Sequence, residues 1–369
     1  MKKKMMMLSM ALVMLLGLCL AGCGGSTKTL NVYNWGQYIS DGSEGTFDTI
    51  REFEKWYAET YGEKIKVNYT TYASNEDMYA KIDSGAVSYD VIIPSDYMIA
   101  RMAEEDLLLP LNFENIPNYK NIGEDFHGLY YDPEDRYSVP YTYGIVGVIY
   151  NANVVDEADA GSWDLMWNEK YSGSILQYNN SRDAFGTAMY KLGLDVNSTD
   201  KAVWDQAAEE LIRQNPVLQG RVMDEIYNRM ESGEAAVGSY YAGDYFTMLD
   251  NQAENVDLKF YYPERTNFFI DAMCIPKCAQ NQELAEIFIN YMLSEEAAVA
   301  NAEYLYYASP NSLVVKNQGY IDYMGQEAME ILYPDLGSFS EQYNQYAYQN
   351  MSQEMLTYLN DLWENVKIN

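Results

Sequence analysis

Two side chains of this sequence lie where their surroundings demand an explanation. Asp271 is placed inside the apolar run FFIDAMCIP, and a buried carboxylate without a partner is strongly destabilising. It therefore needs a positive partner, either a group on a ligand or a Lys or Arg of the protein. Trp35 follows an alternating apolar and polar stretch and stands at the exit of that strand, beside Asn34, Gln37 and Tyr38. Carboxylates and aromatic faces together are the usual components of a site for an organic cation.

The segments that would position these residues alternate between strands and helices. This order is typical of a parallel sheet with helices on both faces, in which ligands bind beyond the carboxyl ends of the strands. Trp35, Ser95 and Tyr97 all lie at such ends, so we expect them to face a cleft. Ser95 also precedes a helix and is in position to cap it. The predicted elements are strands at 30–35, 64–72 and 89–94, and helices at 46–62, 75–85 and 96–108.

A second unit of the same kind follows. Residues 137–155 predict strand segments on both sides of Gly144, where we expect the chain to cross between two units, and 267–276 predict the return crossing. About 345 residues remain after the predicted signal peptide, which is enough for two lobes with separate cores. The sequence therefore predicts an α/β protein with two lobes. Its further predicted elements are a strand at 172–180, helices at 181–193, 281–305 and 353–367, and a strand, turn and helix at 234–246.

The N-terminal residues indicate export. Three lysines precede an apolar run of about 15 residues, shorter than the roughly 20 needed to cross a bilayer and typical of a signal peptide. We expect residues 1–22 to be removed, and Cys23 to carry a lipid, because 20–23 is similar to the bacterial lipobox. Residues 23–28 would then form a flexible tether. The alternative is an ordinary signal peptide with a chance cysteine. We predict an extracytoplasmic, lipid-anchored protein, since no later segment is apolar enough to span a membrane.

The composition restricts the partners. The formal net charge is −31, and it becomes −34 when the three leading lysines are removed with the signal peptide. This charge argues against nucleic acid, which needs a basic surface, and suits a cationic ligand. The chain also contains 36 tyrosines against 11 phenylalanines. Tyrosine has an apolar face and a polar tip, so it suits the walls of a wet cleft.

Few residues are available for covalent or metal chemistry. Besides Cys19 and Cys23, the chain has only Cys274 and Cys278, which would either form a disulfide or serve as two small apolar side chains. His127 is the single histidine, and we expect it in a surface loop. The sequence has no nucleophile elbow, P-loop, dinucleotide fingerprint or zinc pattern. We therefore expect no catalysis, no metal and no cofactor.

Eight motifs occur in an order and spacing that are typical of one family. They are VYNWGQYI, TYASNEDMYAKI, YDVIIPSDYMIARM, SVPYTYGIVGVIYN, YSGSILQYNNSRDAFGTAMYKLG, FFIDAMCIPK, NAEYLYYASPN and LYPD. In these motifs the chain resembles the spermidine/putrescine-binding proteins of bacterial ABC importers over nearly its whole mature length. The resemblance implies a type II periplasmic-binding-protein fold, in which crossing strands join two lobes that close on the ligand.

The same resemblance implies the lobe boundaries and the partners. Lobe 1 would comprise 29–143 and 270–312, and lobe 2 would comprise 144–269 and 313–369. The protein would be a monomeric receptor that captures a polyamine and delivers it to permease subunits in the membrane.

The resemblance also implies a ligand site. Aromatic side chains would pack along the methylenes of the polyamine, and carboxylates would pair with its ammonium groups. Gln37 and Asn180 stand where the family often has acids, and Phe269 where it often has tryptophan, so putrescine, spermidine or a related cation all stay open. The family's C-terminal glutamine matches either Gln342 or Gln345. Matched motif by motif, the site residues are Trp35, Tyr38, Ser95, Tyr97, Asn180, Asp183, Tyr241, Phe269 and Asp271. Asp224 and Glu225 resemble an acidic pair that lies near the cleft in some members.

Two other functions fit part of the sequence. A ferric-ion receptor would use adjacent tyrosines such as Tyr240 and Tyr241, but neighbouring positions of a strand face opposite ways, and we expect Tyr240 in the core. A secreted glycoside hydrolase would use two carboxylates about 5–10 Å apart across a cleft. The sequence favours the polyamine receptor over both.

Overall fold

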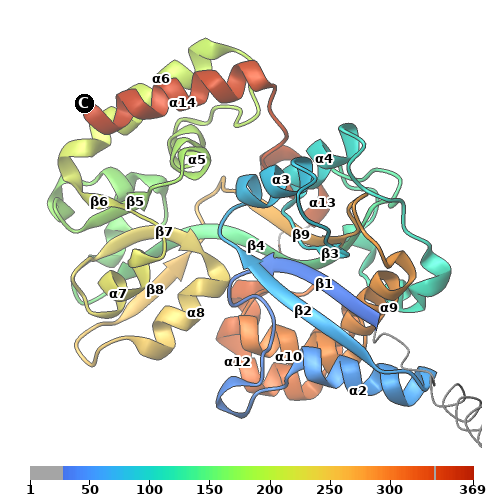
Figure 1. The fold of residues 1–369 in the computed structure, drawn as a ribbon. Helices are drawn as coiled ribbons and strands as arrows, with labels where there is room; N and C mark the ends of the chain where they lie inside the picture. The colour runs from blue at the N-terminus through green and yellow to red at the C-terminus, as the bar shows by residue number, and fades with distance from the viewer. Residues whose placement is uncertain (1–27, 336–337) are drawn as a thin grey trace, which may run out of the picture.

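A computed structural model describes residues 28–335 and 338–369. Within them, nine strands form one mixed sheet in the order β2-β1-β3-β9-β4-β7-β5-β6, and β8 pairs with β4 beside this path (Figure 1). The predicted signal peptide, Cys23 and residues 23–27 lie outside the described residues. The strands are β1 (Lys28–Trp35), β2 (Ile65–Tyr72), β3 (Val91–Ile92), β4 (Ser138–Asn151), β5 (Ile175–Tyr178), β6 (Leu218–Val222), β7 (Val237–Tyr241), β8 (Leu258–Tyr261) and β9 (Phe268–Cys274).

The helices follow the strands as the sequence predicts. Several begin and end where the sequence indicates, for example α5, which is capped by the side chain of Asn180 and ends at Gly193, whose φ is 68°. Only glycine adopts such a φ readily. The α-helices are α2 (Thr49–Tyr61), α3 (Asn75–Asp83), α4 (Asp96–Glu104), α5 (Ser181–Leu192), α6 (Lys201–Gln214), α7 (Glu225–Glu231), α8 (Ala242–Asn251), α9 (Gln282–Met292), α10 (Glu295–Leu305), α11 (Ser312–Lys316), α12 (Gln318–Leu332), α13 (Phe339–Tyr346) and α14 (Gln353–Ile368).

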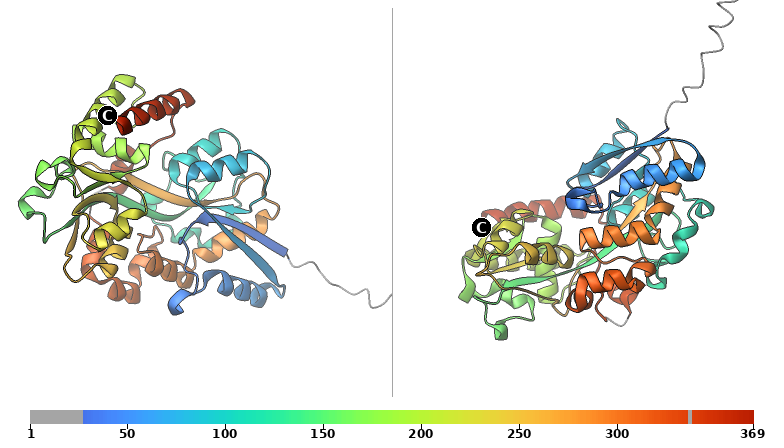
Figure 2. Two further views of the ribbon diagram at one scale, coloured as in Figure 1. Left: turned by 60° about the vertical axis from the view of Figure 1, so that its left-hand side comes forward. Right: turned by 90° about the horizontal axis from the view of Figure 1, so that it is seen from below.

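The sheet has two parallel halves joined by antiparallel strands. In one half β1 pairs in parallel with β2 and β3, and in the other β5 pairs in parallel with β6 and β7. The long strand β4 and the return strand β9 pair with each other and connect the halves. Both expected crossings are thus confirmed, and Figure 2 shows β4 and β9 passing between the two groups of helices.

Several predicted elements are wrong in extent, among them the strand at 172–180 and the helix at 96–108, and two further cases have a visible cause. The strand expected at 89–94 is only two residues long, because the carbonyl of Ile93 accepts hydrogen bonds from the side chains of Trp35 (3.0 Å) and Tyr72 (2.6 Å) instead of continuing the ladder. The single helix expected at 281–305 is two helices, α9 and α10. Ser294 breaks it, since its hydroxyl caps α10 by accepting a hydrogen bond from the backbone of Ala297.

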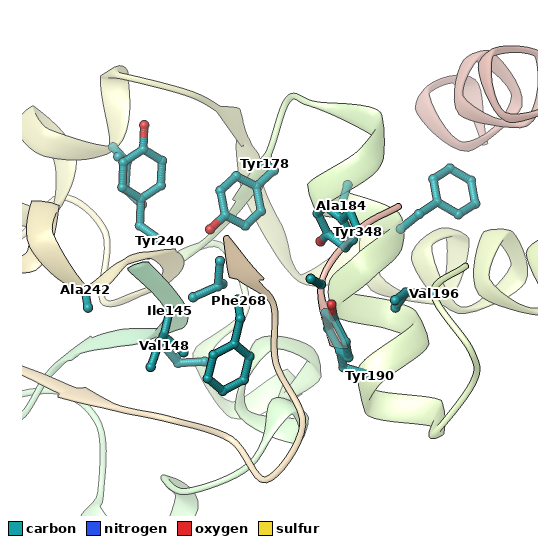
Figure 3. Close-up of a cluster of buried hydrophobic side chains, with 14 of the residues drawn as sticks. Ile145, Val148, Tyr178, Ala184, Tyr190, Val196, Tyr240, Ala242, Phe268 and Tyr348 are labelled. Carbon is teal, nitrogen blue, oxygen red and sulfur yellow. The ribbon is translucent and has the colours of Figure 1, made fainter. Parts of the chain in front are cut away.

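The largest buried cluster extends from Tyr33 on β1 and Met98 on α4 into the half of the molecule that contains β5 to β7. Figure 3 shows aromatic side chains such as Tyr178, Tyr190, Tyr240 and Tyr348 meeting in it from different elements. The C-terminal helix α14 packs along α6 and α5, as Figure 1 also shows. The C-terminal segment therefore closes this half of the molecule.

Membrane-spanning structure is not found in this part of the chain. None of the helices within 28–335 and 338–369 combines the length and the apolar character that a bilayer crossing requires.

Gly144 lies where β4 crosses between the two halves, and no larger side chain fits at this position. It pairs with Phe269 across β4 and β9, and a Cβ atom at residue 144 would lie 2.3 Å from Cζ of the Phe269 ring. The ring of Phe269 therefore lies directly over the backbone of Gly144. This contact fixes the position of an aromatic side chain at the junction of the two halves.

We predict that Gly144→Ala destabilises the protein by about 1–3 kcal/mol, the usual effect of adding a methyl group to a filled site. Gly36→Ala is the matched control, because no atom lies within 4 Å of a Cβ placed there. Denaturant unfolding of both variants measures the difference. Equal stability of the two variants would show that Phe269 moves aside freely.

Candidate ligand-binding site

Asp271 is buried without a counterion. It lies on β9 and is 5% exposed, and its Oδ2 atom accepts a hydrogen bond of 2.7 Å from the hydroxyl of Tyr38. Its Oδ1 atom is buried and accepts no hydrogen bond from the described residues, and no Lys or Arg among them pairs with this carboxylate. Burial raises the pKa of Asp271 to about 6, against the hydroxyls of Ser95 and Tyr38, which lower it. The carboxylate thus keeps capacity for an added cation.

Several polar groups hold Asp271 and its partner in place. The hydroxyl of Tyr38 also lies 2.6 Å from the hydroxyl of Thr142 on β4. Ser95 forms an isolated antiparallel bridge with Asp271, and its hydroxyl accepts a hydrogen bond of 3.1 Å from Asn75. Ser95 does occupy the N-cap position of α4, but its side chain makes no capping hydrogen bond. The hydroxyl is therefore free of the helix and directed to the site.

Asp183 is the second buried carboxylate. It lies in the first turn of α5, is 8% exposed, and accepts a hydrogen bond of 3.2 Å from the hydroxyl of Tyr241. Burial raises the pKa of Asp183 to about 6, although the neighbouring charge of Arg182 lowers it. Asn180 is exposed, and its side chain accepts a hydrogen bond from the backbone of Asp183. The side chain of Asn180 is thus engaged in capping α5.

A row of aromatic rings connects the two carboxylates. It begins at the tyrosine that is bonded to Asp183 and ends at the tyrosine that is bonded to Asp271, and we call it the ring row. Each ring is within contact distance of the next, and all the contacts are edge-on, which is the favourable geometry for aromatic pairs. The centroid distances are 5.3 Å for Tyr241 and Phe269, 6.1 Å for Phe269 and Tyr307, and 5.6 Å for Tyr307 and Tyr38.

Among the described residues, Trp35 and Tyr97 make no ring contact with the members of this row, and their polar atoms are engaged elsewhere. The indole nitrogen of Trp35 donates to the backbone of Ile93, and its ring packs 4.7 Å from that of Tyr72. The hydroxyl of Tyr97 accepts from Asn75 at 3.0 Å. Their role as walls of a site therefore stays a prediction.

The structure adds a carboxylate and an aromatic residue that the sequence did not reveal. Asp244, in the first turn of α8, accepts hydrogen bonds from the hydroxyls of Tyr227 and, at 2.7 Å, Tyr307. Burial raises the pKa of Asp244 to about 6. The only indication of Asp244 in the sequence was its position, three residues after Tyr241 at the end of a strand. Tyr307 was one tyrosine among 36.

The other acidic candidates lie at the margin. Asp224 lies 3.4 Å from the hydroxyl of Tyr240, which is buried as expected, and Glu225 accepts a hydrogen bond from the backbone of Met223. The two candidate glutamines, Gln342 and Gln345, both lie on α13. Between them in sequence, Tyr343 donates a hydrogen bond of 2.7 Å to the buried Asp96.

The residues considered for other chemistry do not form a centre. Cys274 is buried, Cys278 is partly buried, and both are free thiols, which leaves them as small apolar side chains. His127 lies in a loop, where its Nδ1 atom is 3.1 Å from the hydroxyl of Tyr119 and 3.2 Å from Asp135. In the described part of the chain, no three His, Cys, Asp or Glu side chains gather closely enough to hold a metal ion.

Comparison with known proteins agrees with this arrangement of two halves joined by crossing strands. The family model for bacterial extracellular solute-binding proteins matches residues 49–325. The chain belongs to this family. Its fold is the two-lobed type II periplasmic-binding-protein fold, with the site between the lobes. Members of the family are solute receptors and not enzymes, and they act outside the cytoplasm.

Individual relatives are similar over most of their length. The chain is 32% identical to the spermidine/putrescine-binding periplasmic protein of Escherichia coli over 77% of this chain and 78% of the relative. It is 30% identical to the putrescine-binding periplasmic protein SpuD of Pseudomonas aeruginosa over 87% of this chain and 93% of the relative. Among solved structures, PotD of Streptococcus pneumoniae, a spermidine/putrescine ABC transporter substrate-binding protein, superposes with a TM-score of 0.76 at 34% identity, over 93% of this chain and 99% of that one.

We predict that Asp271→Asn stabilises the ligand-free protein at neutral pH by about 1–3 kcal/mol. The raised pKa of Asp271 means that its charged form destabilises the folded state, so the stabilisation should disappear as the pH falls from about 6 to about 4. Denaturant unfolding across this range measures it.

Asp90→Asn is the matched control for this prediction. Asp90 is also fully buried, but its carboxylate accepts hydrogen bonds from the backbone of Asn31, Gln280 and Asn281. Its substitution should destabilise the protein. If both variants lose stability at neutral pH, the carboxylate of Asp271 stabilises the fold and is not an unpaired charge.

Proposed function

We propose that this protein is the substrate-binding receptor of an ABC importer and that it captures polyamines, putrescine or spermidine, between its lobes. The observation that carries the proposal is the ring row, which runs between two buried carboxylates with no counterion from the described residues. The polyamine names of the relatives support the same substrate class.

The arrangement matches the chemistry of a polyamine. Such a molecule is a chain of methylenes with an ammonium group at each end, and spermidine has a third within the chain. The methylenes pack against the ring row, while the ammonium groups bind Asp271 at one end and Asp183 at the other through charge-assisted hydrogen bonds. Cation–π attraction from the rings adds to these bonds. Ser95, Tyr97, Trp35 and Asn180 complete the walls.

The number of carboxylates bears on selectivity. Gln37 and Asn180 bring no charge where the family often has acids, but Asp244 joins the ring row through Tyr307. Asp271, Asp183 and Asp244 thus offer three anionic groups. This set accommodates both a diamine and a triamine, so we propose that putrescine and spermidine both bind.

The ferric-ion alternative is disfavoured by the tyrosines themselves. The rings of Tyr240 and Tyr241 lie 4.9 Å apart, but the hydroxyl of Tyr241 is bonded to Asp183 and that of Tyr240 to Asp224, so each phenol already has its own partner. Burial raises the pKa of both hydroxyls, which opposes the phenolate form that binds iron. The hydrolase alternative is set aside because the family consists of receptors.

We further propose the cellular arrangement. Lobe 1 comprises 29–143 with 270–312, and lobe 2 comprises 144–269 with 313–369. The chain thus passes between the lobes at 143/144 and at 269/270. Within lobe 2, α13 packs back onto β9. A lipid on Cys23 keeps the monomeric receptor at the membrane after removal of residues 1–22. The closed, loaded form docks on the permease subunits.

Calorimetric titration of the protein, prepared without residues 1–27, with spermidine and with putrescine tests the function. We expect binding of both, weakened about ten- to hundredfold by Asp271→Asn, because one charge-assisted contact is lost. Asp361→Asn on the exposed face of α14 is the control and should bind like the wild type. Absence of heat with both polyamines would overturn the proposal.

The affinity for spermidine should also depend on pH. Asp271, Asp183 and Asp244 each have a pKa raised to about 6 by burial, so all three are charged at neutral pH and become protonated below it. A protonated carboxyl group does not pair with an ammonium group. We expect constant affinity above about pH 7 and a steep loss below about pH 6. An affinity that stays constant down to about pH 5 would contradict this account.

A further inference from the structure

The segment that leads from α13 to α14 is held by side chains from distant parts of the chain. We call residues 343–351, which include the last turn of α13, the C-terminal strap (Figure 1). Four consecutive carbonyls of the strap each accept a side-chain hydrogen bond, where a helix or a strand would otherwise pair such groups. The bonds run from Tyr190 to Tyr346 (2.5 Å), from Asn197 to Ala347 (2.8 Å), from Tyr130 to Tyr348 (2.5 Å) and from Arg182 to Gln349 (3.4 Å).

On one side the strap is fastened to α5, in the half of the sheet with β5 to β7. The guanidinium of Arg182 lies 4.6 Å from the ring centroid of Tyr348, and the ring of Tyr190 stacks with that of Tyr348 at 6.4 Å (Figure 3). A Cβ atom at residue 186 would lie 2.0 Å from the hydroxyl oxygen of Tyr348. Gly186 therefore leaves the room on α5 that the ring of the strap occupies.

On the other side the strap is fastened to α4, which follows β3 in the other half of the sheet. Tyr343 donates a hydrogen bond of 2.7 Å to Asp96, the first residue of α4. Asn350 donates one of 3.2 Å to Glu104, the last residue of that helix. Tyr130, which precedes β4, stacks on Tyr343 with ring centroids 5.7 Å apart. One segment of chain is thus bonded to a helix from each half.

The two helices that the strap connects both begin at the candidate site. Ser95 comes directly before α4 and bridges to Asp271, and Asp183 lies in the first turn of α5. The residues next to them in sequence, Asp96 and Arg182, are the ones that bond to the strap. The strap therefore acts on the starts of two helices that bring site residues from opposite halves.

We propose that the C-terminal strap stabilises the approach of the two halves, and that Tyr130, Tyr343 and Arg182 are positioning residues for the ligand site. Separation of α4 from α5 breaks the bonds of the strap to one of these helices, so the bonds favour the arrangement in which the helices are close. A larger population of that arrangement in the empty protein raises the apparent affinity for a ligand that binds it. This last step rests on the proposed function.

Tyr130→Phe and Tyr262→Phe form a matched pair. Both tyrosines are partly buried, and each hydroxyl donates to a backbone carbonyl, that of Tyr348 for Tyr130 and that of Ile331 for Tyr262. Tyr262 follows β8 and its partner lies on α12, away from the strap. Both substitutions keep the ring and remove one hydrogen bond. A difference between them therefore reports the strap and not the general effect of a lost bond.

Small-angle scattering of the ligand-free protein tests the strap itself. Tyr130→Phe combined with Tyr343→Phe should give a larger radius of gyration than the wild type, with an unchanged far-ultraviolet circular dichroism spectrum, while Tyr262→Phe keeps the wild-type radius. Tyr130→Phe alone should shift the radius in the same direction, and it decides the question if the double variant does not fold. An unchanged radius would overturn the inference, whether or not the protein binds polyamines.

Calorimetric titration tests the effect on the site. The double variant should bind spermidine about three- to tenfold more weakly than the wild type, because the arrangement that binds is less populated, whereas Tyr262→Phe should bind like the wild type. Equal affinities of the double variant and Tyr262→Phe would overturn the positioning role and leave the proposed function standing. If the wild type binds no polyamine, the proposed function fails, and the scattering of the ligand-free variants alone decides the inference.

Discussion

The burial of carboxylates without counterions is the constraint on which the rest of this structure depends. Asp271 and Asp183 are each more than nine-tenths buried, and tyrosine hydroxyls are their principal side-chain partners. A hydroxyl stabilises a carboxylate but does not neutralise it. The folded, empty protein therefore holds negative charge in places where water is largely excluded, and it lowers its free energy when a cation arrives. Binding and stability are linked through the same groups.

The fold supplies the geometry that makes this charge useful. β9 carries Asp271 and Phe269 on the strand that returns between the lobes, and Gly144 on β4 leaves room for the Phe269 ring. Asp183 comes from α5, which follows β5 in the other parallel half of the sheet. A ligand that spans the ring row thus touches both lobes and the strand that joins them. In the proposed function, a ligand that makes more contacts with the closed form favours closure of the lobes.

Much of the fold and part of the candidate site could be predicted from the sequence. Asp271 is visible because an acid inside an apolar run has few explanations, and the crossing strands are visible because long apolar stretches surround Gly144 and Asp271. Asp244 was not visible, because an acid in the first turn of a helix is ordinary there. Tyr307 was hidden by the abundance of tyrosine. The short β3 and the break at Ser294 depend on hydrogen bonds by side chains whose partners only the fold brings together. The sequence also left open whether the side chain of Ser95 caps α4, and only the fold shows that it does not.

The most direct test of this account is a carbon-13 NMR titration of the aspartate carboxyl groups, with and without saturating spermidine. The account predicts that Asp271 titrates near pH 6 in the free protein and that spermidine lowers its pKa to about 4 or below, since a bound ammonium group favours the charged form. A pKa of Asp271 that is unchanged by spermidine, in a protein that binds it, would show that the ligand is held elsewhere and would contradict the account.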